Sequence, residues 1–335
     1  MEKLLPKAKQ TEFHWLKLAK KRQLTKTIFF LEFEIPQSLQ VHFQFEAGQY
    51  VTLKYLSMGQ WNQNDFSMTS APYEGKITLG IKINYEKSSA KDLFENLKVG
   101  DLLEVSEPKG RFTLVSKPHE FRTIIGFAGG IGITPLLSHF KNILRNEPRT
   151  RLFLFYGNKT KEDIAFKNEL DELMNSHSDR LKIYYFYSQE KIGNGLFEGR
   201  LNEKKVALII NQILLLDDTD EESTIWDAVD EVLICGKGEM IKSVANACYH
   251  HGIPKRNIHF ELFEEFNEDI YPVEKDFPLI EDIEVDFKLL HHQYSSKLKN
   301  NKVRLLQQLL IQGFPVPYSC KSGIGGSCES VLEEG

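Results

Sequence analysis

The stretch Phe127-Ala-Gly-Gly-Ile-Gly-Ile-Thr-Pro135 decides the fold class of this chain. A short apolar run leads into Gly129, Gly130 and Gly132, and a helical pattern follows. Thr134 is expected to cap that helix, with the proline in its first turn. Glycines let a ligand approach the backbone closely, and a helix N-terminus favours a phosphate. The stretch therefore predicts a strand, a phosphate-binding turn and a helix; a tight turn that only packs is the alternative.

Apolar runs and helical patterns alternate on both sides of this stretch. Strands are expected at 123–128, 151–156, 181–187, 232–235 and 258–262, and helices at 135–144, 162–174 and 240–249. This alternation predicts an α/β domain with a parallel sheet, over 118–266. Cys235 follows one strand and precedes a second glycine turn. A lone cysteine is more often a small buried apolar residue, but the carboxyl end of a parallel strand commonly faces a ligand cleft.

The preceding third of the chain reads differently. Short runs rich in β-branched and aromatic residues occur at 13–18, 27–33, 49–55, 76–84 and 101–106. A single short helix is expected at 90–97. Short strands with few helices predict an antiparallel β-barrel as the first domain, over 1–117.

The last part of the chain begins with an acidic, proline-containing linker at 267–281. A strand is expected at 283–289 and an amphipathic helix at 303–312, ended by Gly313. A unit of this size, over 282–335, is marginal for an independent core.

Composition excludes several classes of protein. The chain has 335 residues, 41% hydrophobic and 27% charged, and a net charge of −5, which argues against a nucleic-acid partner. The N-terminus lacks the apolar region of a signal peptide, and the apolar run 206–216 is too short to span a bilayer. We therefore expect a cytoplasmic protein without a membrane segment. Four cysteines make no disulfide framework in a chain of this length.

A series of short motifs in a fixed order resembles the ferredoxin–NADP reductase superfamily. Within it, the likeness is to reductases with a C-terminal plant-type ferredoxin domain, such as the reductase components of phenylacetyl-CoA epoxidase systems. The motifs are Gly48-Gln-Tyr50, Asn64-Asp-Phe-Ser-Met-Thr-Ser70, Leu97-Lys-Val-Gly-Asp101, Pro108-Lys-Gly-Arg-Phe112, the Gly129 loop, Tyr156-Gly-Asn158, Ser188-Gln-Glu190, Gly199-Arg-Leu201, Cys235-Gly236 with Met240, and His259-Phe-Glu-Leu-Phe263.

The resemblance implies that the first domain binds a flavin, FAD rather than FMN. The implied flavin-binding residues are Asn64, Phe66, Ser67, Met68, Thr69, Ser70, Ile81, Lys82, Ile83, Ser88 and Ser89. Phe66 takes the position of the aromatic that stacks on the flavin. Asn64 stands where the family has an arginine that binds a flavin phosphate, a change that removes about 1–2 kcal/mol of interaction. Lys54 or Lys82 could supply the missing charge.

The second domain is implied to bind NADP or NAD. The residues implied are Gly129, Gly130, Gly132, Thr134, Cys235, Gly236, Met240 and Phe263. Ser67, Cys235 and Glu261 take the family's catalytic positions. For Phe66 and Phe263, ordinary core packing is the alternative explanation. Lys159 and Lys191 follow strand ends where a 2′-phosphate could bind, which slightly favours NADPH.

The segment Pro317-Tyr-Ser-Cys-Lys-Ser-Gly-Ile-Gly-Gly-Ser-Cys328 resembles the cluster loop of a plant-type [2Fe–2S] ferredoxin. Cys320 and Cys328 match the first and third ligands, but Gly325 stands at the second, and the chain ends before a fourth is expected. Two thiolates do not complete the four-cysteine set. We therefore expect a truncated β-grasp, ferredoxin-like tail without a [2Fe–2S] cluster.

The expected activity is that of an NAD(P)H-dependent flavin oxidoreductase. Electrons would pass from NAD(P)H through FAD to an oxygenase component, a separate ferredoxin-like carrier or a small acceptor. The alternative is a degenerate, non-catalytic relative that binds a partner, which the loss of the arginine and of the cluster cysteine would favour.

Overall fold

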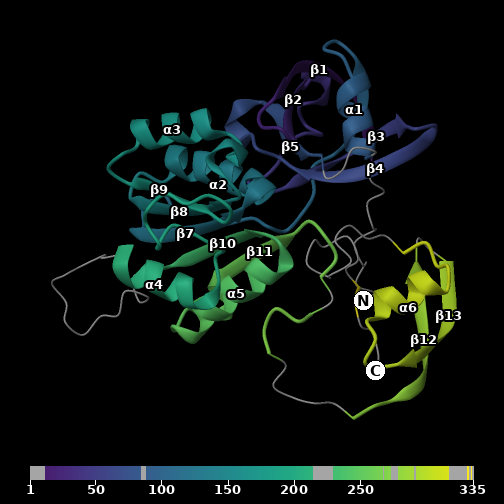
Figure 1. Ribbon diagram of the computed structural model, residues 1–335. Coiled ribbons are helices and arrows are strands. Elements are labelled where there is room, and N and C mark those ends of the chain that lie inside the picture. The colour runs from purple at the N-terminus through teal and green to yellow at the C-terminus, as the bar shows by residue number, and fades with distance from the viewer. Residues whose placement is uncertain are drawn as a thin grey trace.

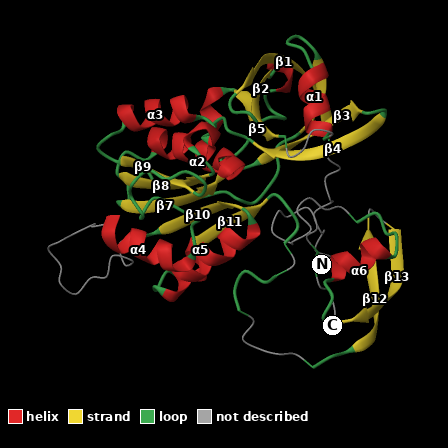
Figure 2. Cartoon of the chain, in the orientation of Figure 1, coloured by secondary structure: helices red, strands yellow, loops and turns green. Residues whose placement is uncertain are grey.

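The computed structural model describes residues 12–83, 88–213, 229–266, 268–272, 278–289, 292–316, 330, 331 and 333. Two large sheets make up most of the molecule, and a small hairpin unit lies apart from them near the C-terminal end (Figure 1). The helices gather around one of the large sheets, whereas the other is built mainly of strands (Figure 2).

The first sheet is antiparallel and curled. Its strands, in the order in which they pair, are β4 (Gln60–Ser67), β3 (Tyr50–Ser57), β6 (Leu102–Ser106), β1 (Phe13–Gln23), β2 (Ile28–Glu34) and β5 (Lys76–Lys82). An isolated bridge between Met68 and Leu79 brings the two edges of the sheet together. Aliphatic and aromatic side chains from all six strands fill the interior. The antiparallel sheet expected for the first third of the chain is confirmed.

One short α-helix and two 3₁₀ turns accompany this sheet. Helix α1 (Ser89–Asn96) begins at Ser88, whose Oγ accepts a hydrogen bond from the backbone N–H of Lys91, and Phe94 packs on Phe29 at 4.6 Å between ring centroids. The 3₁₀ turns of this region are η1 (Gln37–Leu39) and η2 (Pro72–Glu74).

The second sheet is parallel, as the alternating pattern predicts. Its strands pair in the order β11 (Ile258–Leu262), β10 (Glu231–Gly236), β7 (Arg122–Gly129), β8 (Thr150–Asn158) and β9 (Leu181–Tyr187). Helices α2 (Ile133–Asn146) and α3 (Lys167–Ser176) cover one face, and α4 (Glu203–Ile213) and α5 (Gly238–His250) cover the other (Figure 1). Its 3₁₀ turns are η3 (Gly130–Gly132), η4 (Lys161–Asp163) and η6 (Lys255–Asn257). Because both faces are covered, the central strands are nearly continuous hydrophobic runs.

Helix α2 does not begin as the sequence predicts. Turn η3 continues directly into α2, so Gly132 is the N-cap residue and no side chain caps the helix. Thr134 therefore lies inside the first turn, where its Oγ1 donates to the carbonyl oxygen of Ile131 at 3.0 Å. The expectation that Thr134 caps this helix is wrong.

Helix α2 also joins the two sheets. Ser138 Oγ donates to the Ser70 carbonyl oxygen at 2.7 Å, and Lys141 Nζ donates to the Thr69 carbonyl oxygen at 3.0 Å. Both acceptors lie in the segment that follows β4. Because the donors are buried, these bonds form in a medium where an unpaired polar group is costly.

A histidine on the same helix makes a third contact with the first sheet. His139 is buried, and its Nε2 lies 2.7 Å from the carbonyl oxygen of Phe112. A carbonyl oxygen only accepts, so Nε2 donates. Gly48 makes room for this contact, since a Cβ there would lie 1.9 Å from the Phe112 oxygen and 2.2 Å from His139 Nε2. Burial lowers the pKa of His139 to about 4, so the ring is neutral at neutral pH.

The C-terminal unit is a β-hairpin with one helix. Strand β12 (Glu281–Leu289) pairs antiparallel with β13 (His292–Asn300), and α6 (Leu305–Ile311) packs beside β13. Gln308 of α6 donates to the Asn300 carbonyl oxygen at 2.9 Å. Gly313 follows the helix with φ +83°, the left-handed conformation that suits a helix end.

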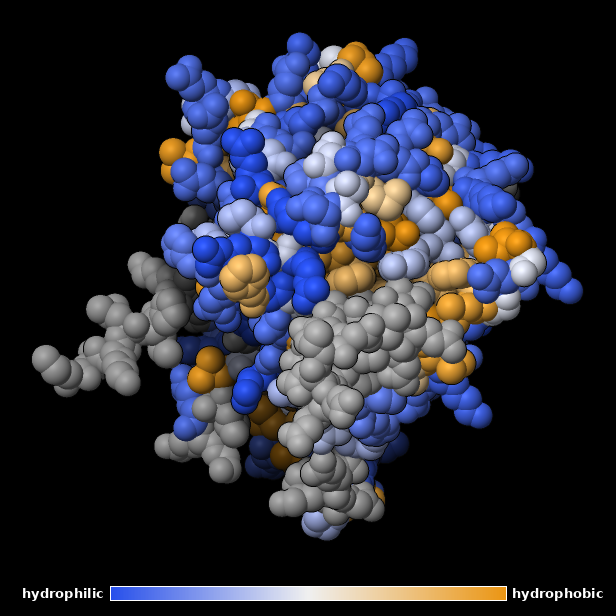
Figure 3. Space-filling model, turned by 90° about the vertical axis from the view of Figure 1, so that its left-hand side faces the viewer, coloured by the Kyte–Doolittle hydropathy of each residue, from blue (hydrophilic) through white to orange (hydrophobic). Residues whose placement is uncertain are grey.

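Three elements have no counterpart in the sequence expectations: β4, β13 and α4. The first two are rich in polar residues, and side chains of α4 pack in the core beneath the second sheet. In the described part of the chain, no helix is long and apolar enough to cross a membrane. The face shown in Figure 3 is mainly hydrophilic, with its hydrophobic residues in separate groups.

We predict that His139 makes the protein sensitive to acid. Its pKa is about 4 in the folded chain against an ordinary value of 6.5, so the unfolded state alone takes up a proton as pH falls between these values. The wild type should lose up to about 3 kcal/mol of unfolding free energy, relative to His139→Gln, between pH 7 and pH 4. Urea unfolding at a series of pH values measures this. The exposed His119→Gln should keep the wild-type profile; parallel profiles for wild type and His139→Gln would refute the prediction.

Candidate functional site

The candidate site lies where the end of β4 meets the carboxyl ends of β10 and β11. Ser67, the last residue of β4, donates from Oγ to Glu261 Oε2 at 2.9 Å. Glu261 on β11 is the register partner of Cys235 on β10, which in turn pairs with Ala128 on β7. The three residues predicted to be catalytic therefore come together from two different sheets.

The carboxyl group of Glu261 is mostly protonated at neutral pH, which is unusual for a glutamate. Its side chain is buried, and this burial raises its pKa to about 8; the hydrogen bond from Ser67 opposes the shift and the charge of Asp65 adds to it. The carboxyl group is therefore mostly protonated at neutral pH. A carboxylic acid poised near neutral pH and bonded to a hydroxyl can hold a proton and release it, as a general acid does.

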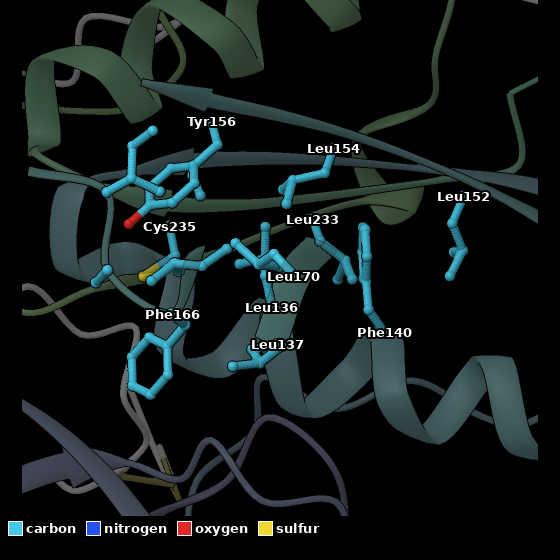
Figure 4. Packing of buried hydrophobic residues seen from close by; sticks show 14 of the residues in the cluster. Leu136, Leu137, Phe140, Leu152, Leu154, Tyr156, Phe166, Leu170, Leu233 and Cys235 are labelled. Carbon is cyan, nitrogen blue, oxygen red and sulfur yellow. The ribbon is translucent and has the colours of Figure 1, made fainter. Parts of the chain in front are cut away.

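The position of Cys235 at the end of a parallel strand suggests that it faces an open cleft. In the structure it does not. Its side chain is fully buried in the core beneath α2, and Figure 4 shows it toward the same end of that cluster as Tyr156 and Phe166. Burial, with a smaller effect of Glu261, raises the pKa of its thiol well above the ordinary value. The group is a neutral thiol rather than a nucleophilic thiolate. Strand β10 lies between two neighbours and under a helix, which explains the burial.

The two glycine turns pass within van der Waals contact of each other. A Cβ on Gly132 would lie 2.1 Å from the carbonyl oxygen of Cys235, and one on Gly129 would lie 2.8 Å from Met240 Sδ. A Cβ on Gly236 would lie 2.9 Å from Met240 Cε, the end of a flexible side chain that is able to shift. Packing therefore requires a glycine at Gly132, and it restricts Gly129 and Gly236 less.

Gly130 differs from its neighbours in the same turn. It has φ +54°, and a Cβ on it would meet nothing within 4 Å. Its backbone therefore borders open space at the carboxyl edge of the sheet. The turn packs closely at Gly132 and borders open space at Gly130, where phosphate binding stays a prediction.

Three lysines converge on the same edge of the sheet. Lys82 ends β5, Lys159 follows β8 and Lys237 follows β10. Burial lowers the pKa of Lys82, the charges of Lys237 and Lys159 lower it further, and the charges of Glu264 and Asp163 oppose the shift. Among the described residues, none of these three forms an ion pair, whereas Lys54 is paired with Glu104 at 2.9 Å. Lys54 is therefore held by a carboxylate, whereas Lys82 is not, and the replacement of the missing arginine by Lys82 stays a prediction.

The residues predicted to bind the flavin separate into two groups. Asn64 is exposed on β4, and its Oδ1 accepts a hydrogen bond from the Tyr55 hydroxyl at 2.8 Å. The same hydroxyl lies 3.1 Å from Ser89 Oγ, so Tyr55 brings Asn64 and Ser89 together. Ser88 is occupied as the cap of α1.

The second group lies in the segment that follows β4, with Ile81 on the neighbouring strand β5. The side chains of Met68 and Ile81 are fully buried in its core. Thr69 Oγ1 is bonded to Thr78 Oγ1 at 2.7 Å, and Ser70 Oγ accepts from the Thr78 backbone N–H at 3.2 Å. These four side chains are used within the protein, and the carbonyl oxygens of Thr69 and Ser70 already accept hydrogen bonds from helix α2.

The remaining predicted residues differ in exposure. Phe66 is half-buried against the core of the first sheet, in keeping with at least partial core packing. Phe263 is 41% exposed, which core packing does not explain. Lys82 and Ile83 are half-buried. Cys320, Gly325 and Cys328 lie outside the described residues.

Sequence reasoning assigned no role to Asn158, at the end of β8. Its side chain is buried, and neither of its polar atoms makes a hydrogen bond of ordinary geometry among the described residues, although the amide acts on the nearby Tyr156 hydroxyl. An unpaired buried amide is unfavourable unless a ligand or water completes it. Its place in the sequence could have pointed to a role, because Asn158 is the last residue of the Tyr156-Gly-Asn158 motif.

Comparison with known proteins identifies the class to which this arrangement belongs. Residues 15–114 match the family described as oxidoreductase FAD-binding domain, and residues 127–246 match the oxidoreductase NAD-binding domain. The chain is 34% identical over 215 residues to NADH-cytochrome b5 reductase 1 of Dictyostelium discoideum, covering 63% of this chain and 68% of that protein. The chain belongs to the ferredoxin-reductase-type flavin oxidoreductases, whose two domains bind FAD and NAD(P).

Two further relatives match most of the chain. It is 28% identical over 330 residues to a subunit of the 1,2-phenylacetyl-CoA epoxidase of Escherichia coli (strain K12), covering 97% of this chain and 88% of that protein. It is 27% identical over 316 residues to the ferredoxin reductase component of 3-ketosteroid-9-alpha-monooxygenase of Rhodococcus rhodochrous, covering 90% of this chain and 81% of that protein.

A solved structure shows the same fold. The chain superposes on a ferredoxin NADP+ reductase from Neisseria gonorrhoeae with bound FAD and NADP, with a TM-score of 0.60 and 18% identity, covering 75% of this chain and 99% of that one. The described site fits such dinucleotide cofactors physically. It offers three unpaired lysines for phosphates, an unpaired buried amide, and open space beside Gly130.

We predict that Glu261 makes the folded protein progressively less stable as pH rises. Its pKa is about 8 when folded against an ordinary value of 4.5, so the unfolded state alone loses a proton between these values. In flavin-free protein, Glu261→Gln should gain about 3–5 kcal/mol of unfolding free energy relative to wild type from pH 4.5 to 8. Chemical unfolding at a series of pH values tests this. Glu172→Gln, on the exposed side of α3, is the control and should follow the wild type.

We predict that alanine is tolerated at one loop glycine and not at another. Gly132→Ala would place its Cβ 2.1 Å from a backbone oxygen, which has no way to move without displacing β10. It should lower thermal stability by several degrees and abolish nucleotide binding. At Gly195, a Cβ meets nothing within 4 Å, so Gly195→Ala should match the wild type. Thermal unfolding and titration with NADP+ measure both effects, and equal behaviour of the two variants would contradict the packing explanation.

Proposed function

We propose that this chain transfers a hydride from NADPH to FAD and then passes electrons to an oxygenase component or a separate electron carrier. The contact that carries the proposal is the buried hydrogen bond between Ser67 and Glu261 at 2.9 Å. It links a hydroxyl on the flavin side to a protonated carboxyl group on the nicotinamide side. Core packing has no need of such a costly group, because burying an acid is unfavourable.

Each of the three residues has a proposed task. FAD, when bound, accepts two electrons as a hydride and can release them one at a time. Ser67 would orient the reacting edge of the flavin through its hydroxyl, and Glu261 would hold a proton behind it. The neutral thiol of Cys235 and the Thr134 side chain, both buried, would exclude water from the path between the cofactors.

The lysine group formed by Lys82, Lys159 and Lys237 is proposed to bind cofactor phosphates. Three like charges close together are unfavourable alone, and an anion relieves their repulsion. Lys82 would take over the phosphate contact that an arginine at position 64 makes in the family. Lys159 and Lys237 would favour a 2′-phosphate, which supports NADPH as donor.

The proposed acceptor is a protein rather than only a small molecule. Two relatives that match most of this chain are named as parts of an epoxidase and a monooxygenase. The proposal divides the chain into a flavin domain at 1–117, a nicotinamide domain at 118–266, a linker at 267–281 and an incomplete ferredoxin-like unit at 282–335. Support for the last comes from the hairpin followed by α6, and from Gly325 at a cluster-ligand position. Electrons would then leave from the flavin directly.

The visible absorption spectrum of the full-length protein, before and after adding NADPH or NADH, tests the proposal. We expect flavin bands that bleach on addition of the nucleotide, faster with NADPH. A colourless protein that does not take up added FAD would favour a non-catalytic partner-binding protein instead. Broad extra absorption together with iron and acid-labile sulfide would show a cluster in the tail and contradict direct exit from the flavin.

We predict that Ser67→Ala keeps the flavin but slows its reduction. Removing the hydroxyl breaks the only side-chain bond to Glu261 among the described residues, so the proton behind it is no longer positioned. Stopped-flow reduction by NADPH should slow about tenfold to hundredfold at unchanged flavin content. Ser57→Ala is the matched control, a buried serine at the far end of β3, and should keep the wild-type rate. An unchanged rate in Ser67→Ala would argue against the assigned role.

A further inference from the structure

Two histidines and two glutamates meet at the end of the curled sheet where β1 begins and β6 ends. Each contributes one nitrogen or oxygen atom, and these four atoms all lie within 4.8 Å of one another. We call this group the His–Glu cluster; its members are Glu12, His14, His42 and Glu107. None of them belongs to the candidate site described above.

The backbone places these residues through three separate segments. His14 is on β1, opposite Val105 of β6, and the N–H of Glu107 donates to the carbonyl oxygen of Glu12 at 3.1 Å. His42 comes from the turn after η1, where its N–H donates to the Leu39 carbonyl oxygen at 3.0 Å. The arrangement is therefore built by the sheet and one turn.

Hydrogen bonding among the side chains accounts for only part of the cluster. His42 Nδ1 lies 2.7 Å from Glu107 Oε1, an ordinary hydrogen bond. His14 Nε2 lies 3.8 Å from the same oxygen, and it is buried with no hydrogen-bond partner among the described residues. The two imidazole rings lie 4.7 Å apart between centroids. A buried ring nitrogen without a partner calls for a ligand at that point.

We propose that the His–Glu cluster binds one divalent transition-metal ion, with Zn²⁺ as the ion that its chemistry favours. Imidazole nitrogens suit zinc and its neighbours, whereas calcium and magnesium prefer sites made of oxygen alone. Two imidazoles and two carboxylates give four ligands, the number that zinc takes, and the carboxylates neutralise its charge.

The geometry is close to what a tetrahedral site needs. Metal–ligand distances of about 2.0–2.2 Å put neighbouring ligand atoms roughly 3.3 Å apart. The two nitrogens lie 2.7 and 3.8 Å from Glu107 Oε1, on either side of that value. Glu12 and His42 are the exposed members of the cluster, so their side chains have room to rotate when an ion binds.

An ion here would act as a structural clip. It would connect the start of β1, the turn after η1 and the residue that follows β6. Two residues after Glu107, the backbone of Lys109 exchanges two hydrogen bonds with Tyr50 of β3. A metal ion that binds only the folded chain stabilises it by an amount that grows with the logarithm of the ion concentration above its dissociation constant.

Calorimetric titration of the chelator-treated, FAD-loaded full-length protein with ZnCl₂ tests this. We expect one ion bound at the cluster, and at least tenfold weaker binding in His42→Ala and in Glu12→Gln, both exposed positions where loss of folding is not expected. His250→Ala is the matched control, because His250 forms an isolated pair with Glu203 at 2.9 Å. It should bind as the wild type does.

Zinc could also bind the tail cysteines, so the titration is repeated on a Cys320→Ser, Cys328→Ser variant. Binding that survives in this variant and is lost in His42→Ala supports the proposal. Binding that is lost with the cysteines and kept in His42→Ala overturns it, as does the absence of any binding.

Thermal unfolding supplies an independent measurement. Zinc should raise the melting temperature of wild type and His250→Ala and leave that of His42→Ala unchanged. Equal shifts in all three proteins would overturn the proposal, because the stabilising ion would then lie elsewhere.

Discussion

The docking of helix α2 onto the segment after β4 is the interaction on which the rest of the structure depends. Ser138 and Lys141 donate to two consecutive carbonyl oxygens, those of Ser70 and Thr69. Their donors are buried, so sliding the sheets past each other would leave polar groups unpaired in the interior. This contact holds the end of β4 in place, and so it places Ser67 against Glu261. The geometry of the site is therefore set by a helix that contributes few groups to it.

The site itself contains features that work against stability. Burial keeps Glu261 protonated to about pH 8, and Lys82 lies near two further lysines without forming an ion pair among the described residues. A chain selected for stability alone would have paired or removed these groups. Their presence beside tightly packed glycine turns is typical of a functional site, where local cost is offset by the packing around it.

Much of the fold could be predicted, because it rests on local patterns. The parallel strands are buried on both faces and so are continuous apolar runs, and glycine turns follow β7 and β10. Strand β4 could not be predicted: its sequence QWNQNDFS is largely polar and exposed, and only pairing with β3 along its full length makes it a strand. Strand β13 is a similar case, held by its partner β12. Both strands pair with the strand just before them, and because they are polar and mostly exposed, they carry too little apolar alternation to predict a strand.

The sequence by itself determined which residues could form the site and in what chemical class, because glycines, a cysteine and an acid at strand ends are local features. It also showed that Asn64 and Gly325 depart from the family pattern. Only the tertiary structure decided that Cys235 is buried and neutral, since its burial depends on neighbouring strands and on α2. Likewise, only the structure showed that Ser67 reaches Glu261 across 194 positions of sequence, because that distance is closed by packing between two sheets.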